Sequence, residues 1–289
     1  MKFLTFFFLV CVVLTDPLKA FSFDSQSNKA PLEINAQNGM IYSQDKKRCT
    51  ASGPVVSTKG TSVLKSEKLV VYFKDKSSPK AEQSGGDPQQ DVEKIEAIGD
   101  VHFFDTRGDS EGGVEATGTY ALYQENEGKL ILEGRPILKD SKTVISGGTQ
   151  VIFYERAQMA KTVGRSTVKR DDKLMQADAF NIYFTKDATG KLTFDRVEAH
   201  GNVLISTPTE IAKAKRGVYA NITQVAELFD DVVITRIEGQ LRGNYGRYDM
   251  ASGQSQLFQD QGTHEHAKQV QAILSPKVLK RTKVKKKTT

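Results

Sequence analysis

Cysteine is scarce in this chain, which limits how the fold can be stabilised. Only Cys11 and Cys49 are present among 289 residues. Cys11 lies in an N-terminal segment typical of an export signal, so removal of that segment would leave Cys49 as the only thiol. No internal disulfide could then form, although exported proteins meet an oxidising compartment. The fold must therefore be stabilised by packing.

Long apolar runs are also lacking. The most apolar stretch, residues 3–14, is twelve residues long, whereas a membrane-spanning helix needs about 20. It follows Lys2 and precedes Ala20, which is the order of an export signal. Two interpretations stay open: cleavage after Ala20, or an uncleaved inner-membrane anchor that also uses residues 18–23. A lipid-anchored form is disfavoured, because Val10 precedes Cys11 where lipid attachment requires a small residue.

The motifs that many enzymes and metal proteins carry are absent. There is no Cys-x-x-Cys, no His-Glu-x-x-His, no phosphate loop and no Gly-x-Ser-x-Gly. His264 and His266 flank Glu265 in a polar stretch, where solvation is the simplest interpretation. Asp230 and Asp231 stand where other repeats carry a turn glycine. The sequence therefore predicts no catalytic residue, no metal site and no cofactor.

Charge is distributed unevenly along the chain. The formal net charge is +6, but residues 277–289 carry seven basic groups and no acidic one, and the first twenty residues add one net positive charge. Subtracting both contributions leaves −2 for residues 21–276. The folded part therefore lacks the basic surface that nucleic acids require, and no nucleic-acid partner is predicted. The cations of the basic tail are expected to favour anionic lipid surfaces.

Two short elements alternate along the body of the chain. The first is glycine or aspartate, one further residue and usually valine, and it begins at Gly53, Gly99, Gly134, Gly164, Gly201 and Asp230. The second opens with a small residue and leads into an aromatic strand, and it covers residues 66–73, 116–123, 146–154, 177–184, 214–219 and 243–248. Successive first elements are 29 to 46 residues apart. One hairpin per repeat is therefore predicted, with strands nearly throughout.

Each predicted strand has one apolar face, because side chains alternate across a strand. In residues 94–104, Ile95, Val101 and Phe103 share one face, while His102 lies on the polar face, as His200 does further on. Two such sheets can close on each other. Glycine recurs at one place on the apolar face, which indicates that the strands bend there between the sheets.

Four parts of the chain follow from these patterns. Residues 1–20 form the signal, residues 30–160 a first β region, residues 161–260 its continuation or a second similar unit, and residues 261–289 a basic, disordered tail. Residues 75–91 indicate a loop, and residues 263–274 are the one stretch expected to form a helix. Repeats that bury one face only against their neighbours form an open-ended stack, whose end strands stay exposed unless a partner pairs with them.

Three stretches carry a resemblance to a known family. They are Ala-Pro-Leu-Glu-Ile-Asn-Ala at residues 30–36, Lys-Ser-Glu-Lys-Leu-Val-Val-Tyr-Phe at residues 65–73, and Glu-Ala-Ile-Gly-Asp-Val at residues 96–101. In their order and spacing, and together with an export signal, they resemble the LptA/OstA-like family of periplasmic lipopolysaccharide-transport proteins. The resemblance covers residues 30–155 well and residues 160–260 more loosely. This chain departs from it by its length, the insertion at 75–91 and the basic tail.

The resemblance implies an all-β, open-ended β-jelly roll whose apolar interior shields the acyl chains of lipopolysaccharide in the periplasm. It also implies terminal-strand pairing with inner- and outer-membrane transport proteins of the same fold, and it leaves a head-to-tail homo-oligomer open. Such a protein is not an enzyme. The candidate groove residues are Leu69, Val71, Phe73, Val101, Phe103, Leu132, Leu138, Phe153, Ile182 and Val203.

The residue pattern does not separate a lipid groove from a closed core built of the same side chains. The second interpretation is therefore an envelope assembly or docking scaffold with a closed β-sandwich and no lipid cargo. A third, a glycan-active enzyme on a β-solenoid, would need paired carboxylates along one face. Aspartate and glutamate instead scatter over polar faces and loops, which argues against that interpretation.

Overall fold

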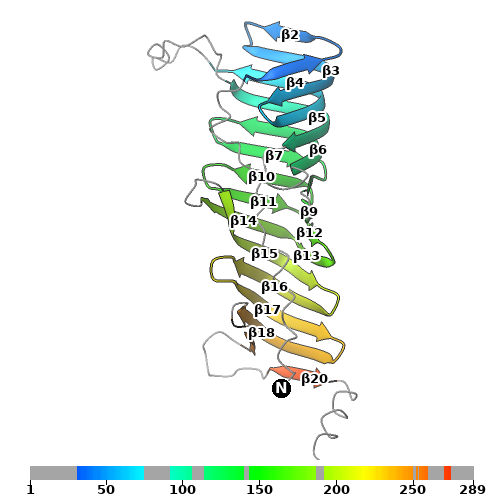
Figure 1. The fold of residues 1–289 in the computed structure, drawn as a ribbon, viewed down its shortest axis with the longest axis vertical. Helices are drawn as coiled ribbons and strands as arrows, with labels where there is room; N and C mark the ends of the chain where they lie inside the picture. Colours follow the sequence, from blue (N-terminus) through cyan, green and yellow to red (C-terminus); the bar gives the residue numbers. More distant parts are fainter. Residues whose placement is uncertain are drawn as a thin grey trace, which may run out of the picture. The chain divides into compact units, whose positions relative to one another are not determined.

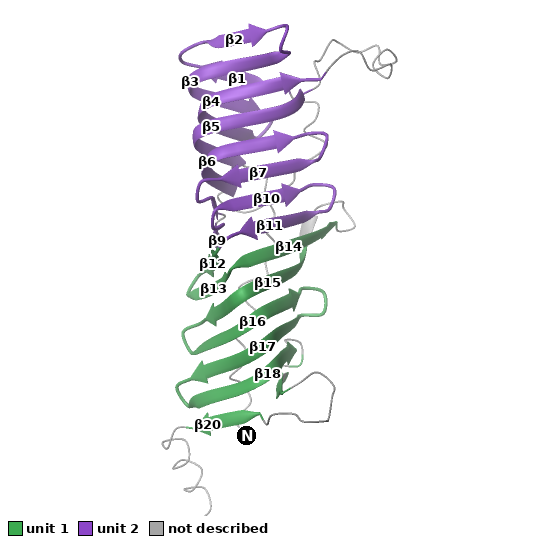
Figure 2. Ribbon diagram, turned by 180° about the vertical axis from the view of Figure 1, so that it is seen from behind, with its two compact units in different colours: residues 1–17, 165–289 green, residues 18–164 purple. Residues whose placement is uncertain are grey.

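The computed structural model describes residues 31–74, 92–105, 114–139, 143–186, 192–249, 252, 254–259 and 270–274. The chain divides after Gly164 into two compact units, which Figure 2 shows in different colours. The N-terminal unit is described between Pro31 and Gly164, and the C-terminal unit between Arg165 and Leu274. The described residues contain twenty strands and no helix. The all-β class expected from the sequence is confirmed.

The N-terminal unit is a ladder of antiparallel strands joined largely by hairpins (Figure 1). Its strands are β1 (Glu33–Ala36), β2 (Met40–Ser43), β3 (Arg48–Lys59), β4 (Ser62–Phe73), β5 (Val92–Asp105), β6 (Val114–Gln124), β7 (Lys129–Glu133), β8 (Ile137–Lys139), β9 (Thr143–Ser146), β10 (Gln150–Tyr154) and β11 (Met159–Val163). The long strands β3 to β6 pair in sequence order. Sequence-adjacent pairing of this kind is what a hairpin repeat predicts.

The C-terminal unit is built in the same way. Its strands are β12 (Ser166–Arg170), β13 (Lys173–Ala177), β14 (Ala179–Lys186), β15 (Leu192–Ser206), β16 (Glu210–Ala220), β17 (Val225–Arg236), β18 (Gly239–Asp249), β19 (Gln254–Phe258) and β20 (Gln271–Leu274). Strands β15 to β18 again pair in sequence order.

The prediction of a helix at residues 263–274 is wrong for the part of this stretch that the structure describes. Gln271–Leu274 forms β20 and pairs with Gly239–Arg242 of β18. A ready sheet edge supplies backbone hydrogen bonds that a short, uncapped helix does not secure in water. Strand β20 also falls within residues 261–289, which the sequence assigned to a disordered tail. The signal, the loop at 75–91, His264, His266 and residues 275–289 lie outside the described residues.

The long strands bend at the glycine or aspartate that repeats in the sequence. The cross-strand register shifts between Ser52 and Val55, between Ile98 and Val101, between His200 and Val203, and between Phe229 and Val232. The residues at these shifts that have no cross-strand partner adopt left-handed backbone angles, with φ of +72° at Gly201 and +45° at Asn202. A bulge of this kind redirects a strand. The bend predicted at the recurrent glycine is therefore confirmed.

These bends divide each unit into two arms. In the N-terminal unit, arm A contains β2, β7, β10, β11 and residues 48–52, 68–73, 92–98 and 120–124. Arm B of this unit contains β1, β8, β9 and residues 55–59, 62–66, 101–105 and 114–118. In the C-terminal unit, arm A contains β14, β19 and residues 192–200, 216–220, 225–229 and 245–249. Arm B of this unit contains β12, β13, β20 and residues 203–206, 210–214, 232–236 and 239–243. Each unit is thus jelly-roll-like.

The buried apolar side chains follow the two-residue period on one face of each arm, which we call the inner face. In arm A of the N-terminal unit, Leu69 pairs with Ala97, and Leu132 pairs with Val151, all four buried. In arm A of the C-terminal unit, Phe180 is fully buried opposite Ala199. The apolar faces expected from the alternation are therefore the faces that fold inward.

The opposite, outer face of arm A carries aromatic rings that are covered by cations. Lys94 Nζ lies 4.0 Å from the centre of the Tyr72 ring, Arg196 Cζ lies 4.3 Å from that of Tyr183, and Arg216 Cζ lies 4.3 Å from that of Phe229. Such contacts stabilise a ring that would otherwise face water, and a cation keeps this surface polar.

Replacing Gly201 with alanine tests the bend. Gly201 has φ +72°, and a Cβ there would stand about 3.0 Å from Asp178 Cβ and Cγ and nearer still to Asp178 Oδ2. Left-handed strain together with this clash should lower the free energy of unfolding by about 2 kcal/mol, measured by urea denaturation. The matched variant Asn202→Gly relaxes the neighbouring left-handed residue and should cost less than about 1 kcal/mol. Equal losses in the two variants would contradict the explanation.

Candidate functional site

An apolar cleft opens on the inner faces of the C-terminal unit. Its lining residues are Met175, Val197, Ala199, Val203, Ile205, Glu210, Ala212, Gly217, Val218, Tyr219, Ala226, Glu227, Leu228, Ile234, Gly246, Arg247, Tyr248 and Gln256. The empty volume is about 680 Å³, open space at the mouth included. Ligand pockets are lined mainly by apolar side chains. The cleft therefore has the lining of a site for an apolar ligand.

The cleft exists because small residues alternate with large ones on the inner face of arm A. Cross-strand pairing places Ala199, Gly217, Leu228 and Gly246 in one row. A Cβ built on Gly246 would meet its neighbours only at ordinary contact distances of 3.5 to 3.9 Å. Side chains that stop short on successive strands leave room that a sheet of valine and leucine would fill.

Arm B closes the other side of the cleft. Met175, Ile205, Ala212 and Ile234 are successive cross-strand partners on β13, β15, β16 and β17, and all four are buried. Strands of both arms thus contribute to one cleft, and its two walls are held together by the bends.

A row of charged residues borders this apolar wall. Arg170 pairs with Lys173 across β12 and β13, and Glu210 pairs with Arg236 across β16 and β17. Arg170, Lys173 and Glu210 are 5%, 8% and 4% exposed. Charged side chains are seldom buried to this extent unless they are paired or functional.

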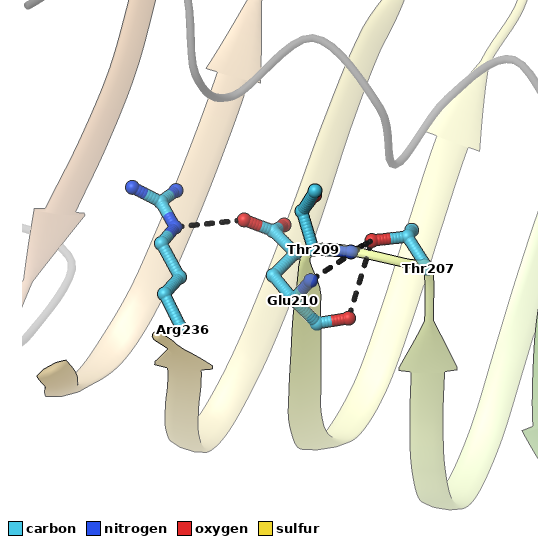
Figure 3. A network of polar contacts seen from close by, with 4 residues as sticks. All are labelled: Thr207, Thr209, Glu210 and Arg236. Atoms are coloured by element: carbon cyan, nitrogen blue, oxygen red, sulfur yellow. Dashed lines mark hydrogen bonds and ion pairs between the residues drawn. The ribbon is translucent and has the colours of Figure 1, made fainter. Parts of the chain in front are cut away.

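The best-defined contact of the row is the ion pair between Glu210 and Arg236 (Figure 3). Arg236 Nε donates to Glu210 Oε2 at 2.8 Å. Thr207 holds the turn before Glu210, because its hydroxyl accepts from the Glu210 backbone N–H at 3.1 Å. Burial raises the pKa of the Glu210 carboxyl above its usual range, and the Arg236 charge and hydrogen bond only partly oppose this rise.

Replacing Arg236 with methionine should destabilise the protein in a pH-dependent way. At neutral pH the buried Glu210 carboxylate would lose its counter-charge, at a cost of about 3 kcal/mol. The folded-state pKa of Glu210 is raised, so ionised Glu210 opposes folding at neutral pH, and this cost disappears as the pH falls through that pKa. Urea denaturation at neutral and at acidic pH should therefore show a smaller loss in acid. The exposed Arg242, changed to methionine on β18, is the matched control, and a loss independent of pH would contradict the assignment.

The ten groove residues predicted from the sequence fall into both units, and all lie on inner faces. In the N-terminal unit, Leu69, Val71, Val101, Leu132, Leu138 and Phe153 are buried, while Phe73 and Phe103 are half-buried. In the C-terminal unit, Ile182 and Val203 are buried, and Val203 lines the cleft. Their role in holding lipid stays a prediction.

The interior of the N-terminal unit also holds titratable groups. Asp105 is buried and accepts hydrogen bonds from Thr61 Oγ1 at 3.0 Å and from Ser62 Oγ at 2.8 Å. Burial, followed by the charges of nearby glutamates, raises the pKa of Tyr123 to about 12. Neutral hydroxyls are expected on this inner face at physiological pH.

The other residues considered in the sequence lie at the surface or in bends. His102 Nε2 is 2.8 Å from Glu115 Oε1, and His200 Nε2 is 3.5 Å from Glu198 Oε2, with both imidazoles substantially exposed. Asp230 and Asp231 occupy a bend with φ of +64° and +55°, as their alignment with the turn glycines predicted. Among the described residues, no group of three or more His, Cys, Asp or Glu could hold a metal ion.

Sequence reasoning missed the buried charges of the C-terminal unit. The signal was present, because Arg170 follows Ser166 and Val168, and Lys173 precedes Met175 and Ala177, at the two-residue spacing of one face. A charge on an apolar face is visible in such a pattern. Its burial became evident only once β12 and β13 were placed among their neighbours.

Comparison with known families decides the identity. The model of the family described as LptA/(LptD N-terminal domain) LPS transport protein matches this chain twice, over residues 33–159 and 150–254. The chain belongs to this lipopolysaccharide-transport family. The resemblance stated from three short stretches is therefore confirmed, and the family match extends to the C-terminal unit that carries the cleft.

One similar solved structure is the crystal structure of LptH, the LptA homologous periplasmic component of the lipopolysaccharide transport device from Pseudomonas aeruginosa. The two share 12% identity over 58% of this chain and 99% of LptH, with a TM-score of 0.27. None of the curated proteins compared with the sequence matches it. No helix in the described part of the chain is long and apolar enough to span a membrane.

Proposed function

We propose that this protein holds the acyl chains of lipopolysaccharide in the cleft of its C-terminal unit while the lipid crosses the periplasm to the outer membrane. The observation that supports the proposal is an apolar cleft, lined by both arms, in a member of a lipopolysaccharide-transport family. Acyl chains need an apolar surface shielded from water and no directional contacts. Movement of the lipid would be driven by partner proteins.

Photo-cross-linking tests this proposal. A photoreactive amino acid at Leu228, which lines the cleft, should cross-link to lipopolysaccharide, while the same probe at Val225 on the outer face should not. The same probe at Phe103, which is half-buried on arm B of the N-terminal unit, tests whether that unit also binds lipid. A folded protein that gives no cross-link at Leu228 or Phe103 would favour the docking scaffold.

The end strands support a proposal about partners. Among the described strands, β2 pairs only with β3 and β20 pairs only with β18. Both are apolar and exposed, with Ile41 71% exposed on β2 and Ile273 52% exposed on β20. An exposed strand edge of this kind adds a strand from another chain readily. Transport proteins of the same fold, or a second copy of this chain, are the partners proposed for these edges.

Charge introduced on β2 should disrupt that pairing. Ile41→Asp is expected to reduce end-to-end association at least tenfold, measured by sedimentation velocity, because a carboxylate would have to be desolvated at the joined edge. Ile222→Asp, at an exposed turn residue, is the matched control. Association unchanged by Ile41→Asp would exclude β2 as the docking edge.

A further inference from the structure

Charged side chains of the C-terminal unit lie in two pairs along the inner face of arm B. Lys173 lies one residue before Leu174, which pairs with Ser206, so Lys173 stands beside Thr207. The backbone N–H of Thr207 donates to the carbonyl of Glu210 at 3.0 Å. This register places Arg170 beside Lys173 and Arg236 beside Glu210, with Thr207 between the two pairs. Adjacent strands lie about 4.8 Å apart, so Arg170 and Lys173 are close neighbours, whereas Arg236 stands three strand spacings from Lys173.

This row directly adjoins the apolar cleft. Glu210 itself lines the cleft, and Met175 and Ile234, two residues from Lys173 and Arg236 along their strands, line it as well. Residues two apart on a strand share a face and stand about 7 Å apart. A molecule whose apolar chains occupy the cleft would therefore have its polar end within reach of the row.

Among the described residues, Lys173 is the member of the row whose charge is unpaired. In the described part of the chain, no carboxylate lies within ion-pair distance of the Lys173 amino group, although that side chain belongs to a residue only 8% exposed. Burying a cation in this way is costly unless an anion compensates it.

The N-terminal unit has no such row among its described residues. Its one buried charged residue there is the acid Asp105, which pairs with Ser62 across β4 and β5 and accepts hydrogen bonds from it. Both buried basic residues of the described chain, Arg170 and Lys173, lie in the C-terminal unit. An anionic group would accordingly be attracted to one unit and not to the other.

We propose that Lys173, with Arg170 beside it across β12 and β13, binds the phosphate of a phosphorylated lipid whose acyl chains occupy the cleft. The inference rests on the proposed function and adds to it a polar recognition site on arm B. Guanidinium and ammonium groups donate charge-assisted hydrogen bonds to phosphate oxygens, and arginine does so through two parallel donors. Lys173 therefore distinguishes phosphorylated from dephosphorylated lipids of the same chain composition.

Binding of the full-length protein to bisphosphorylated and to fully dephosphorylated lipid A tests the inference. Wild-type protein should prefer the phosphorylated form. Lys173→Gln should weaken its binding about tenfold, as loss of one charge-assisted contact implies, and should leave the dephosphorylated form unaffected. Lys173→Arg should keep the preference. Lys169→Gln and Lys213→Gln remove the same charge from exposed positions on neighbouring strands and should change neither affinity.

Each alternative outcome has a definite meaning. Equal wild-type affinity for the two lipids would overturn the phosphate site while leaving the acyl-chain cleft standing, whereas binding of neither lipid would remove the proposed function itself. Equal losses for both lipids in Lys173→Gln would make Lys173 a structural residue and overturn its assignment. If inorganic phosphate at the same concentration as the lipid abolished the preference for the phosphorylated form, the site would be one for the free anion instead. Lys173→Met, which retains the buried apolar stem, separates loss of charge from loss of packing.

Discussion

Ala226→Phe is expected to reduce lipopolysaccharide binding at least tenfold with little loss of stability. Ala226 lines the cleft and lies between its cross-strand partners Tyr219 and Tyr248 on the inner face of arm A. A phenyl ring at this position would extend toward the cleft, so it should take up volume that an acyl chain would occupy. Because the cleft accepts the ring, the free energy of unfolding should change by less than about 1.5 kcal/mol. Lipid binding and urea denaturation are measured on the same preparation.

Val225→Phe is the control for this prediction. Val225 is the preceding residue of β17 and faces the opposite side of the sheet, so its ring cannot enter the cleft. Binding should stay at the wild-type level in this variant. Loss of binding in Val225→Phe equal to that in Ala226→Phe would mean that the sheet is distorted, and unchanged binding in Ala226→Phe would mean that the lipid lies elsewhere.

Phe180→Ala is expected to have the largest effect on stability, a loss of about 4 kcal/mol. Phe180 is fully buried on the inner face of β14 and pairs with Ala199 of β15. Removing a buried phenyl group costs its transfer free energy and leaves a cavity, and such changes destabilise by about 3–5 kcal/mol. The neighbouring alanine is too small to fill the space. Hydrogen exchange of β14 and β15 should accelerate most, because the lost contacts lie there.

Asn181→Ala supplies the comparison for Phe180→Ala. Asn181 is the next residue of β14 and lies on the outer face, where its Nδ2 is 3.4 Å from His200 Nε2. This partly exposed contact should contribute less than about 1 kcal/mol. If Phe180→Ala cost no more than Asn181→Ala, the inner face of β14 would not be a packed core.

Much of the fold could be predicted from sequence because its signals are local. Alternation of apolar and polar residues has a period of two, so the inner face of residues 94–104 was assigned from that segment alone. The bends were predicted for a similar reason, since glycine at Gly99 and Gly201 indicates a backbone conformation that other residues rarely adopt. The helix expected near the C-terminus was wrong, because pairing of β20 with β18 joins segments about thirty residues apart.

The candidate site could be predicted only in part. Val203 was identified as a groove candidate and lines the cleft, whereas Leu228 and Ala226 were not identified. Which apolar side chains pack and which leave space depends on the volumes of residues brought together by register. Gly246 contributes to the cleft because it lies opposite Leu228 on the neighbouring strand. A short stretch of sequence does not reveal that the two residues are partners.

The bent, one-sided strands in their repeating order and the likeness to a lipopolysaccharide-transport family could be recognised in the amino-acid sequence. Those properties depend on side-chain alternation, on glycine and on short motifs, all of which are local along the chain. The cleft of the C-terminal unit, and the charged residues Arg170, Lys173, Glu210 and Arg236 beside it, became visible in the folded chain. Cavities and the burial of charge depend on which distant strands become neighbours, because free volume and desolvation are properties of packed surfaces and not of single strands.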